Sequence, residues 1–290
     1  MVARKDFDGT ERPTWCRGCG NHAILNGIKM ALAEHDIAPH EILIVTGIGC
    51  GSKLPHYMKV NGYHTLHGRT LAVATGARLA NHGLRVMTVH GDGDGYGEGL
   101  SHFLNAVRRN LNITDVVQDN RIYGLTKGQY SPTSERGKHT PTSPEGSIDG
   151  PVQPLAMAIT AGATFVSRGY SGELRHLAWL IGEALKHPGY ALVDVLQPCV
   201  TFNRSYAYDF YNERVYRLED EEGYDPTDRT AAWEKAHEWG ERIPIGIFYR
   251  GEPIPTYEEQ VPALRAGPLV KQPLEPEWIR RMEAIKQKYV

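Results

Sequence analysis

The stretch Val86-Met87-Thr88-Val89-His90-Gly91-Asp92-Gly93-Asp94 joins an apolar run to a turn of alternating glycine and aspartate. The apolar run is typical of a buried parallel strand that ends near His90. Gly91 and Gly93 let the backbone turn sharply and approach a phosphate closely. Asp92 offers a carboxylate oxygen to Mg²⁺, which keeps few protein ligands and takes the others from phosphate and water. The stretch therefore predicts a phosphate-and-metal loop at the end of a strand.

A second apolar strand, Ile113 to Val117, leads to Asp-Asn-Arg-Ile-Tyr-Gly-Leu-Thr-Lys-Gly-Gln at 119–129. Asn120 can supply another ligand oxygen, and the backbone carbonyl of Ile122 a third. Residues 94–119, a gap of 26, separate Gly93 from Asn120. A glycine-flanked aspartate and an asparagine at this spacing resemble the diphosphate-and-metal motif of thiamine diphosphate enzymes. A Gly-Asp-Gly sequence on its own is usually a turn, so the interpretation depends on the spaced asparagine and its strand–helix–strand context.

The chain has four cysteines. Cys16 and Cys19 form a Cys-x-x-Cys pair, whereas Cys50 and Cys199 stand alone in loops marked by glycine or proline. Four thiolates suit either Zn²⁺ or an iron–sulfur cluster, and one pair with two distant single cysteines modestly favours the cluster. The alternative is a redox pair with two inert core cysteines. Disulfides are disfavoured, because residues 1–11 are charged and lack the apolar core of a secretory signal.

Together these motifs resemble one family, the β subunits of 2-oxoacid:ferredoxin oxidoreductases, which includes pyruvate and 2-oxoglutarate members. The resemblance covers roughly residues 12–205 and suits the short, two-subunit type. It implies that a [4Fe–4S] cluster is bound by Cys16, Cys19, Cys50 and Cys199, and that Mg²⁺ is bound by Asp92, Asn120 and the carbonyl of Ile122. The residues expected at the thiamine diphosphate are Gly49, Cys50, His67, Gly91, Asp92, Gly93, Asp94, Asn120, Ile122, Gly124, Leu125 and Thr126.

Strands and helices alternate along the chain. Strands are expected at 42–46, 84–90, 113–118, 164–166 and 191–196, and helices at 22–34, 70–81, 99–109, 153–161, 172–186, 230–239 and 275–287. This order predicts an α/β fold with a mostly parallel sheet and helices on both faces. Ligands bind beyond the carboxyl ends of such strands, so the cluster and the cofactor should be neighbours.

Two segments depart from this alternation. Residues 131–152 are rich in Ser, Thr, Pro and Gly, and they are too long for a plain connection. We expect this segment to be a flap over the cofactor or a contact with a partner; the alternative is a mobile surface insertion. Residues 204–290 are rich in tyrosine, charge and proline, and we expect an extended arm in contact with another subunit. The predicted division is therefore 1–203 for the cofactor-binding domain and 204–290 for the arm.

Composition agrees with a soluble globular protein of 290 residues. The net charge of −2 argues against a nucleic-acid surface. Apolar runs are interrupted within a few residues, so no membrane-spanning helix is expected. Metal-bound cysteines without a signal sequence point to the cytoplasm.

The resemblance also implies a reaction. The predicted enzyme decarboxylates a 2-oxoacid oxidatively and reversibly, forms an acyl-coenzyme A, and passes electrons through one [4Fe–4S] cluster to ferredoxin. The expected substrate is 2-oxoglutarate, with pyruvate next. Thiamine enzymes also need a pyrimidine-binding domain, for which this chain has no room. A partner α subunit should supply it, so the chain should be active only in a complex of the (αβ)2 type.

Lys53 and Lys127 are the candidates for holding the substrate carboxylate, because each lies in a loop expected to line the cofactor. An isolated lysine is more often solvated surface. Two other functional classes remain open. One is a zinc-stabilised binding module, and the other is a non-oxidative thiamine diphosphate decarboxylase or synthase, which the four cysteines and the short chain disfavour.

Overall fold

The chain folds around one eight-stranded sheet in this computed structural model, which describes residues 1–273 and 276–289. The strands are β1 (Ile42–Thr46), β2 (Asn61–His64), β3 (Arg85–Gly91), β4 (Thr114–Asp119), β5 (Phe165–Tyr170), β6 (Ala191–Leu196), β7 (Val215–Arg217) and β8 (Ile243–Arg250). Their order across the sheet is β2-β1-β3-β4-β6-β5-β8-β7. The first six strands in this order are parallel, and β8 runs antiparallel to β5. The predicted mostly parallel α/β sheet is confirmed.

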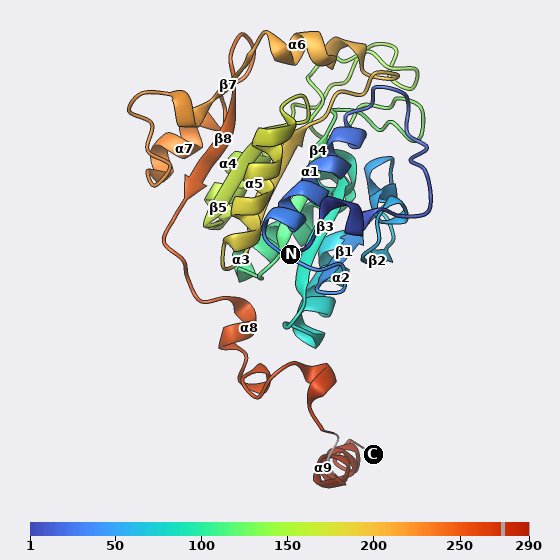
Figure 1. Ribbon diagram of the computed structural model, residues 1–290, viewed down its shortest axis with the longest axis vertical. Coiled ribbons are helices and arrows are strands. Elements are labelled where there is room, and N and C mark those ends of the chain that lie inside the picture. Colours follow the sequence, from blue (N-terminus) through green and yellow to red (C-terminus); the bar gives the residue numbers. More distant parts are fainter. Residues whose placement is uncertain (274–275, 290) are drawn as a thin grey trace.

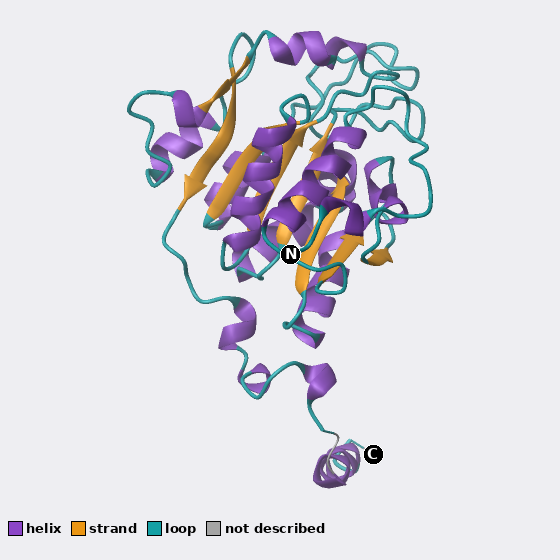
Figure 2. Ribbon diagram, viewed as in Figure 1, coloured by secondary structure: helices purple, strands orange, loops and turns teal. Residues whose placement is uncertain are grey.

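Helices cover both faces of the sheet (Figures 1 and 2). The longer ones are α1 (Asn21–Glu34), α2 (Thr70–Ala80), α3 (Leu100–Arg109), α4 (Pro154–Ala161), α5 (Leu174–Lys186), α7 (Arg229–Lys235) and α9 (Pro276–Lys286), and the short ones are α6 (Tyr208–Asn212) and α8 (Tyr257–Gln260). Helices α1 and α5 pack together on one face, and α2, α3, α4 and α7 contribute to the core on the other face. Within the described residues, no helix is long and apolar enough to cross a membrane.

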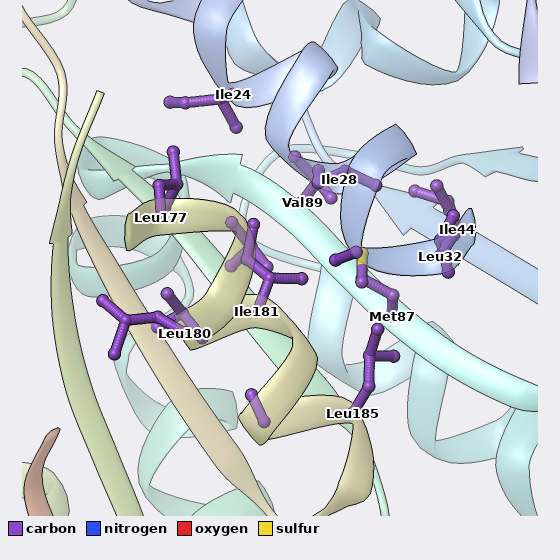
Figure 3. Close-up of a cluster of buried hydrophobic side chains, with 14 of the residues drawn as sticks. Ile24, Ile28, Leu32, Ile44, Met87, Val89, Leu177, Leu180, Ile181 and Leu185 are labelled. Atoms are coloured by element: carbon purple, nitrogen blue, oxygen red, sulfur yellow. The ribbon is translucent and has the colours of Figure 1, made fainter. Parts of the chain in front are cut away.

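The core beneath α1 and α5 illustrates why these segments are helical. Apolar residues recur every three or four positions, so they form one stripe on each helix. Figure 3 shows these stripes meeting over β3, with Ile28 of α1 and Ile181 of α5 close to Met87 and Val89. All four of these side chains are completely shielded from solvent. This packing fixes the strands whose carboxyl ends carry the loops described below.

The segment 204–290 differs in part from an extended arm. Strands β7 and β8 from this segment belong to the sheet, and β8 is buried beside β5. After Arg250 the chain leaves the sheet and runs past α8 towards α9, which lies at the far end of the molecule (Figure 1). Contact of this segment with another subunit stays a prediction.

Candidate functional site

One pocket lies at the carboxyl ends of the central strands. It is lined by the loops that follow β1, β2, β3 and β4. All twelve residues expected at the cofactor line it: Gly49, Cys50, His67, Gly91, Asp92, Gly93, Asp94, Asn120, Ile122, Gly124, Leu125 and Thr126. They meet because parallel strands place their carboxyl ends on one edge, and the pairing of Gly91 with Gln118 aligns the two loops. That these residues bind thiamine diphosphate stays a prediction.

Asp92 is buried at the base of this pocket. Two hydroxyl groups from the loop after Gln129 approach the same carboxylate oxygen, Oδ2: Ser131 Oγ at 2.5 Å and Thr133 Oγ1 at 2.6 Å. Thr133 Oγ1 also lies 2.7 Å from Oδ1 of Asp119. Burial, together with the charge of Asp119, raises the pKa of Asp92 to about 7. A carboxylate in this environment is stabilised by a nearby cation.

Asp94 ties three loops together. Its Oδ1 accepts hydrogen bonds from the backbone N–H of Ile48 (3.0 Å) and of Gly68 (2.9 Å), and its Oδ2 accepts one from the hydroxyl of Thr70 (2.8 Å). A Cβ atom on Gly47 would overlap with Oδ2 of Asp94, so only glycine fits there. The predicted cofactor-lining residue Asp94 thus also fixes the loop that carries Cys50.

The backbone after β4 turns through an unusual conformation. Arg121 has φ +57°, in the left-handed region that non-glycine residues rarely adopt. Its guanidinium lies 4.1 Å from the ring centre of Trp239 and 4.9 Å from that of Tyr206, and its carbonyl accepts a hydrogen bond from Ser134 Oγ (2.7 Å). These contacts hold the turn that brings Asn120 and Ile122 to the pocket.

The four cysteines come from three loops and approach one another. Cys50 lines the pocket, and a Cβ on Gly124 would lie 3.9 Å from Sγ of Cys50 and 3.7 Å from Sγ of Cys199. The N–H of Gly20 bonds to the carbonyl of Pro198 (3.3 Å), which ties the Cys16–Cys19 turn to the Cys199 segment. Burial raises the pKa of Cys19 to about 12, and the other three cysteines add to this increase. The thiols are therefore close enough to interact electrostatically.

No compact single-ion site is formed by these groups. Within the described part of the chain, no three His, Cys, Asp or Glu side chains converge closely enough to hold one metal ion. A tetrahedral Zn²⁺ site would need such a convergent group, because Zn–S bonds of ~2.3 Å hold two thiolate sulfurs roughly 3.8 Å apart.

The two candidate lysines do not line the pocket. Lys53 is half-buried just after Cys50, and its charge lowers the pKa of the Cys50 thiol, although burial leaves that pKa above its usual value. Lys127 is exposed, with φ +77°, in a turn closed by its N–H and the carbonyl of Gly124 (3.2 Å). Their roles at the substrate stay predictions.

Several residues of the site were not predicted from the sequence. Ile48, Gly51, Gln118 and Tyr123 also line the pocket. Gln118 is 1% exposed, and within the described residues neither polar atom of its buried amide has a hydrogen-bond partner. A buried amide of this kind costs free energy unless it is paired, so it marks a place for a polar group in the pocket. Its position in β4, one residue before Asp119, was the signal available in the sequence.

Comparison with known proteins gives two family matches. Residues 47–195 match the thiamine pyrophosphate enzyme, C-terminal TPP binding domain, and residues 199–266 match the C terminal of the pyruvate ferredoxin oxidoreductase beta subunit. The first match contains β3, β4 and the loops of the pocket. The second begins at Cys199 and contains β7 and β8.

Whole-chain similarities agree with these matches. The chain is 46% identical over 256 residues to the beta subunit of 2-oxoacid:ferredoxin oxidoreductase 1 of Aeropyrum pernix, covering 85% of this chain and 80% of that protein. It is 46% identical over 199 residues to the 2-oxoglutarate oxidoreductase subunit KorB of Mycobacterium tuberculosis, covering 69% of this chain and 53% of that protein. Among solved structures, it resembles a 2-oxoglutarate:ferredoxin oxidoreductase from Magnetococcus marinus with 2-oxoglutarate, coenzyme A and succinyl-CoA bound, with a TM-score of 0.89 and 37% identity over 98% of this chain and 96% of that chain. The chain therefore belongs to the β subunits of the 2-oxoacid:ferredoxin oxidoreductases.

Proposed function

We propose that this protein, together with a partner, performs the coenzyme A-dependent oxidative decarboxylation of a 2-oxoacid, with 2-oxoglutarate favoured and pyruvate next. The products are an acyl-coenzyme A and CO₂, and the electrons pass through one [4Fe–4S] cluster to ferredoxin, in a reversible reaction. The observation that carries the proposal is that Cys50 lines the pocket that holds Asp92 and Asn120, with Cys199 beside it and the Cys16–Cys19 turn tied to the Cys199 segment. A non-oxidative thiamine enzyme would have no use for cysteines at this place.

Thiamine diphosphate with Mg²⁺ fits the residues of the pocket. Asp92, the amide oxygen of Asn120 and the carbonyl of Ile122 would hold the cation, and all three residues line the pocket. The unpaired amide of Gln118 provides a donor and an acceptor for the cofactor side of the pocket. When bound, the cofactor would supply the nucleophilic carbon that attacks the ketone of the 2-oxoacid.

A [4Fe–4S] cluster fits the four cysteines better than Zn²⁺ does. The thiols surround one region from three loops, whereas the described residues contain no compact single-ion group. Burial disfavours the thiolate form of Cys19 and of Cys50, and a bound metal centre would offset this by stabilising the thiolates. Cys16, Cys19, Cys50 and Cys199 would be its ligands.

The residues of this chain then bind and orient the reactants. Asp94 fixes the Cys50 loop against the loop of Asp92, so that cluster and cofactor keep a constant separation. Tyr123 lies over Gly93, where a Cβ would overlap with its ring, so a glycine is needed at this point of the pocket. Lys53 and Lys127 would place positive charge near the substrate carboxylate, a role suited to loops beside the pocket.

A partner α subunit would complete the site. Tyr63 near the end of β2 and Leu66, Leu125 and Phe202 on loops are large, mostly apolar side chains at the carboxyl edge of the sheet, and each is at least 39% exposed. Leu125 also lines the pocket. A group of this kind around a pocket favours burial by another protein surface. We propose the (αβ)2 arrangement and a cytoplasmic location, which suits a reduced cluster.

The test is a steady-state assay of the purified αβ complex, prepared without oxygen. It measures ferredoxin reduction with 2-oxoglutarate, pyruvate and a branched 2-oxoacid, each with and without coenzyme A. We expect coenzyme A-dependent reduction, fastest with 2-oxoglutarate, and no activity of the isolated chain. Asp92→Ala should lose Mg²⁺-dependent retention of thiamine diphosphate, while iron content is unchanged. CO₂ release without ferredoxin reduction would favour the non-oxidative enzyme, and a colourless protein with one zinc per chain would favour a binding module.

A further inference from the structure

A continuous series of hydrogen bonds joins the cation side of the pocket to one of the cysteines. The backbone N–H of Ile122 bonds to Oδ1 of Asn120 at 3.0 Å. The amide Nδ2 of Asn120 bonds to Oε1 of Gln197 at 3.0 Å. The amide Nε2 of Gln197 lies 3.4 Å from Sγ of Cys19. Gln197 is therefore the link between the two predicted cofactor sites.

The direction of each bond follows from backbone partners. The N–H of Ile122 can only donate, so the atom of Asn120 that faces it is the amide oxygen. Nε2 of Gln197 lies 2.7 Å from the carbonyl oxygen of Pro198, which can only accept, so this atom is the amide nitrogen. Gln197 therefore accepts from Asn120 and donates towards the sulfur of Cys19.

Gln197 is held rigidly in this position. Its side chain is 1% exposed, and its backbone N–H bonds to the carbonyl of Asp119 at 2.9 Å, directly beyond the pairing of β4 with β6. A Cβ on Gly20 would lie 2.9 Å from Cγ of Gln197, so the chain next to Cys19 packs tightly against it. The side-chain amide of Gln197 therefore has little room to rotate towards other hydrogen-bond partners.

The chemistry of a donor at this sulfur is specific. When a [4Fe–4S] cluster gains one electron, negative charge on its cysteine sulfurs increases, and an N–H···S bond becomes stronger. Such a bond therefore stabilises the reduced cluster and raises its reduction potential. A cation on Oδ1 of Asn120 would make the Asn120 amide a stronger donor, and bonds in series reinforce one another.

We propose that Gln197 is a positioning residue that relays the state of the cation site to the cluster. Through its amide it raises the reduction potential of the cluster and makes that potential increase when thiamine diphosphate and Mg²⁺ bind. The inference rests on the proposed function, since it requires the cluster at Cys19 and the cation at Asn120. By linkage, reduction of the cluster strengthens binding of the cofactor by the same factor.

The experiment is an EPR-monitored redox titration of the αβ complex, with and without Mg²⁺ and thiamine diphosphate. Gln197→Met keeps the length of the side chain and removes both polar atoms. Gln197→Glu keeps an acceptor for Asn120 and removes the donor to Cys19. Gln260→Met is the control, because Gln260 is exposed on α8 and its side chain bonds to the nearby carbonyls of Pro255 and Thr256. Resonance Raman spectra in H₂O and D₂O report the N–H···S bond directly.

We expect the wild-type potential to rise on cofactor binding, and both Gln197 variants to have lower potentials with full iron content. The rise should shrink in Gln197→Met, and the Fe–S(Cys) bands should lose their D₂O shift, whereas Gln260→Met should match the wild type. The proposal is contradicted if the reduction potential of the wild-type cluster is the same with and without the cofactor. It is also contradicted if the Gln197 variants have the wild-type potential or assemble no cluster. A wild-type complex without any cluster would instead contradict the proposed function itself.

Discussion

Asp92 depends on two hydroxyl groups for its orientation, and this dependence can be measured. Ser131 and Thr133 both contact Oδ2, so together they fix the rotation of the carboxylate. Thr133→Val keeps the shape of the side chain and removes the hydroxyl. A hydrogen bond to a charged group contributes about 1.5–3 kcal/mol, so we expect Mg²⁺ affinity to fall at least ~10-fold. Isothermal titration calorimetry with saturating thiamine diphosphate measures the Mg²⁺ affinity. Two control variants should keep nearly wild-type affinity: Thr133→Ser, which retains the hydroxyl, and Thr142→Val, which changes an exposed residue.

Lys127 lies on the pocket side of the molecule without lining the pocket. If its ammonium approaches the substrate carboxylate, Lys127→Ala should lower kcat/KM for 2-oxoacids at least about tenfold, which corresponds to ~1.4 kcal/mol. Cofactor affinity and iron content should not change, because Lys127 is exposed and is not among the residues that line the pocket. Near-normal kinetics with every 2-oxoacid would leave Lys53 or the partner subunit as the anchor.

His187 should make stability depend on pH. Burial, with the charge of Arg250 nearby, lowers the pKa of His187 to about 4, and its Nε2 lies 2.7 Å from the hydroxyl of Thr164. The unfolded chain therefore binds a proton that the folded chain excludes between pH 6.5 and 4. The contribution of neutral His187 to the free energy of unfolding is fully present above pH 6.5. About 2 kcal/mol of it is lost as the pH falls through that window. Urea unfolding from pH 7 to 4.5 should show the free energy of unfolding of the wild type falling relative to that of His187→Gln as the pH is lowered, and parallel curves would contradict it.

At the scale of single elements, α8 is anchored to α2 by one buried ion pair. Nε of Arg78 lies 2.6 Å from Oε1 of Glu258, and the two side chains are 11% and 3% exposed. Glu258→Ala leaves the guanidinium buried without its partner, which costs about 3–5 kcal/mol. We expect the chain after Gly251 to detach and to become sensitive to protease, as mass spectrometry of the fragments can detect. The double variant Arg78→Leu, Glu258→Leu removes both charges and should regain resistance to protease. The control variant Glu252→Ala changes an exposed glutamate and should remain resistant.

Strands with an unbroken apolar run were predicted well from the sequence, and strands whose apolar run is interrupted were not. β6 coincides with the predicted 191–196, because every residue of this central strand is buried. β8 was missed, since Pro244 and Gly246 interrupt its apolar run; Pro244 lies outside the part of the strand that pairs with β5. At the site, Asp92 and Asn120 were predictable because both follow parallel strands. Gln197 and Thr133 were not, because an amide or a hydroxyl acquires its role only from partners far away in the sequence.

At the scale of the whole molecule, the apolar residues around the pocket predict how the complex assembles. Leu66 is 76% exposed next to His67, on the edge where the α subunit should bind. Leu66→Asp would bury a charge without a partner, so we expect the αβ complex to dissociate while the isolated β subunit stays folded. Light scattering after size-exclusion chromatography measures this. Trp179→Asp changes an exposed residue of α5, outside the loops of the pocket and outside the segment 204–290, and should leave the complex intact.

The position of β8 has a consequence for synthesis on the ribosome. Strand β5 is complete at Tyr170, but its outer edge is covered only when β8, Ile243–Arg250, has emerged. About 70 residues separate the two strands, and translation at roughly 5–20 residues per second leaves that edge open for several seconds. An unpaired apolar edge recruits other strands. The nascent chain should therefore require a holding chaperone during this interval, and slow codons between the two strands should reduce the yield of soluble protein.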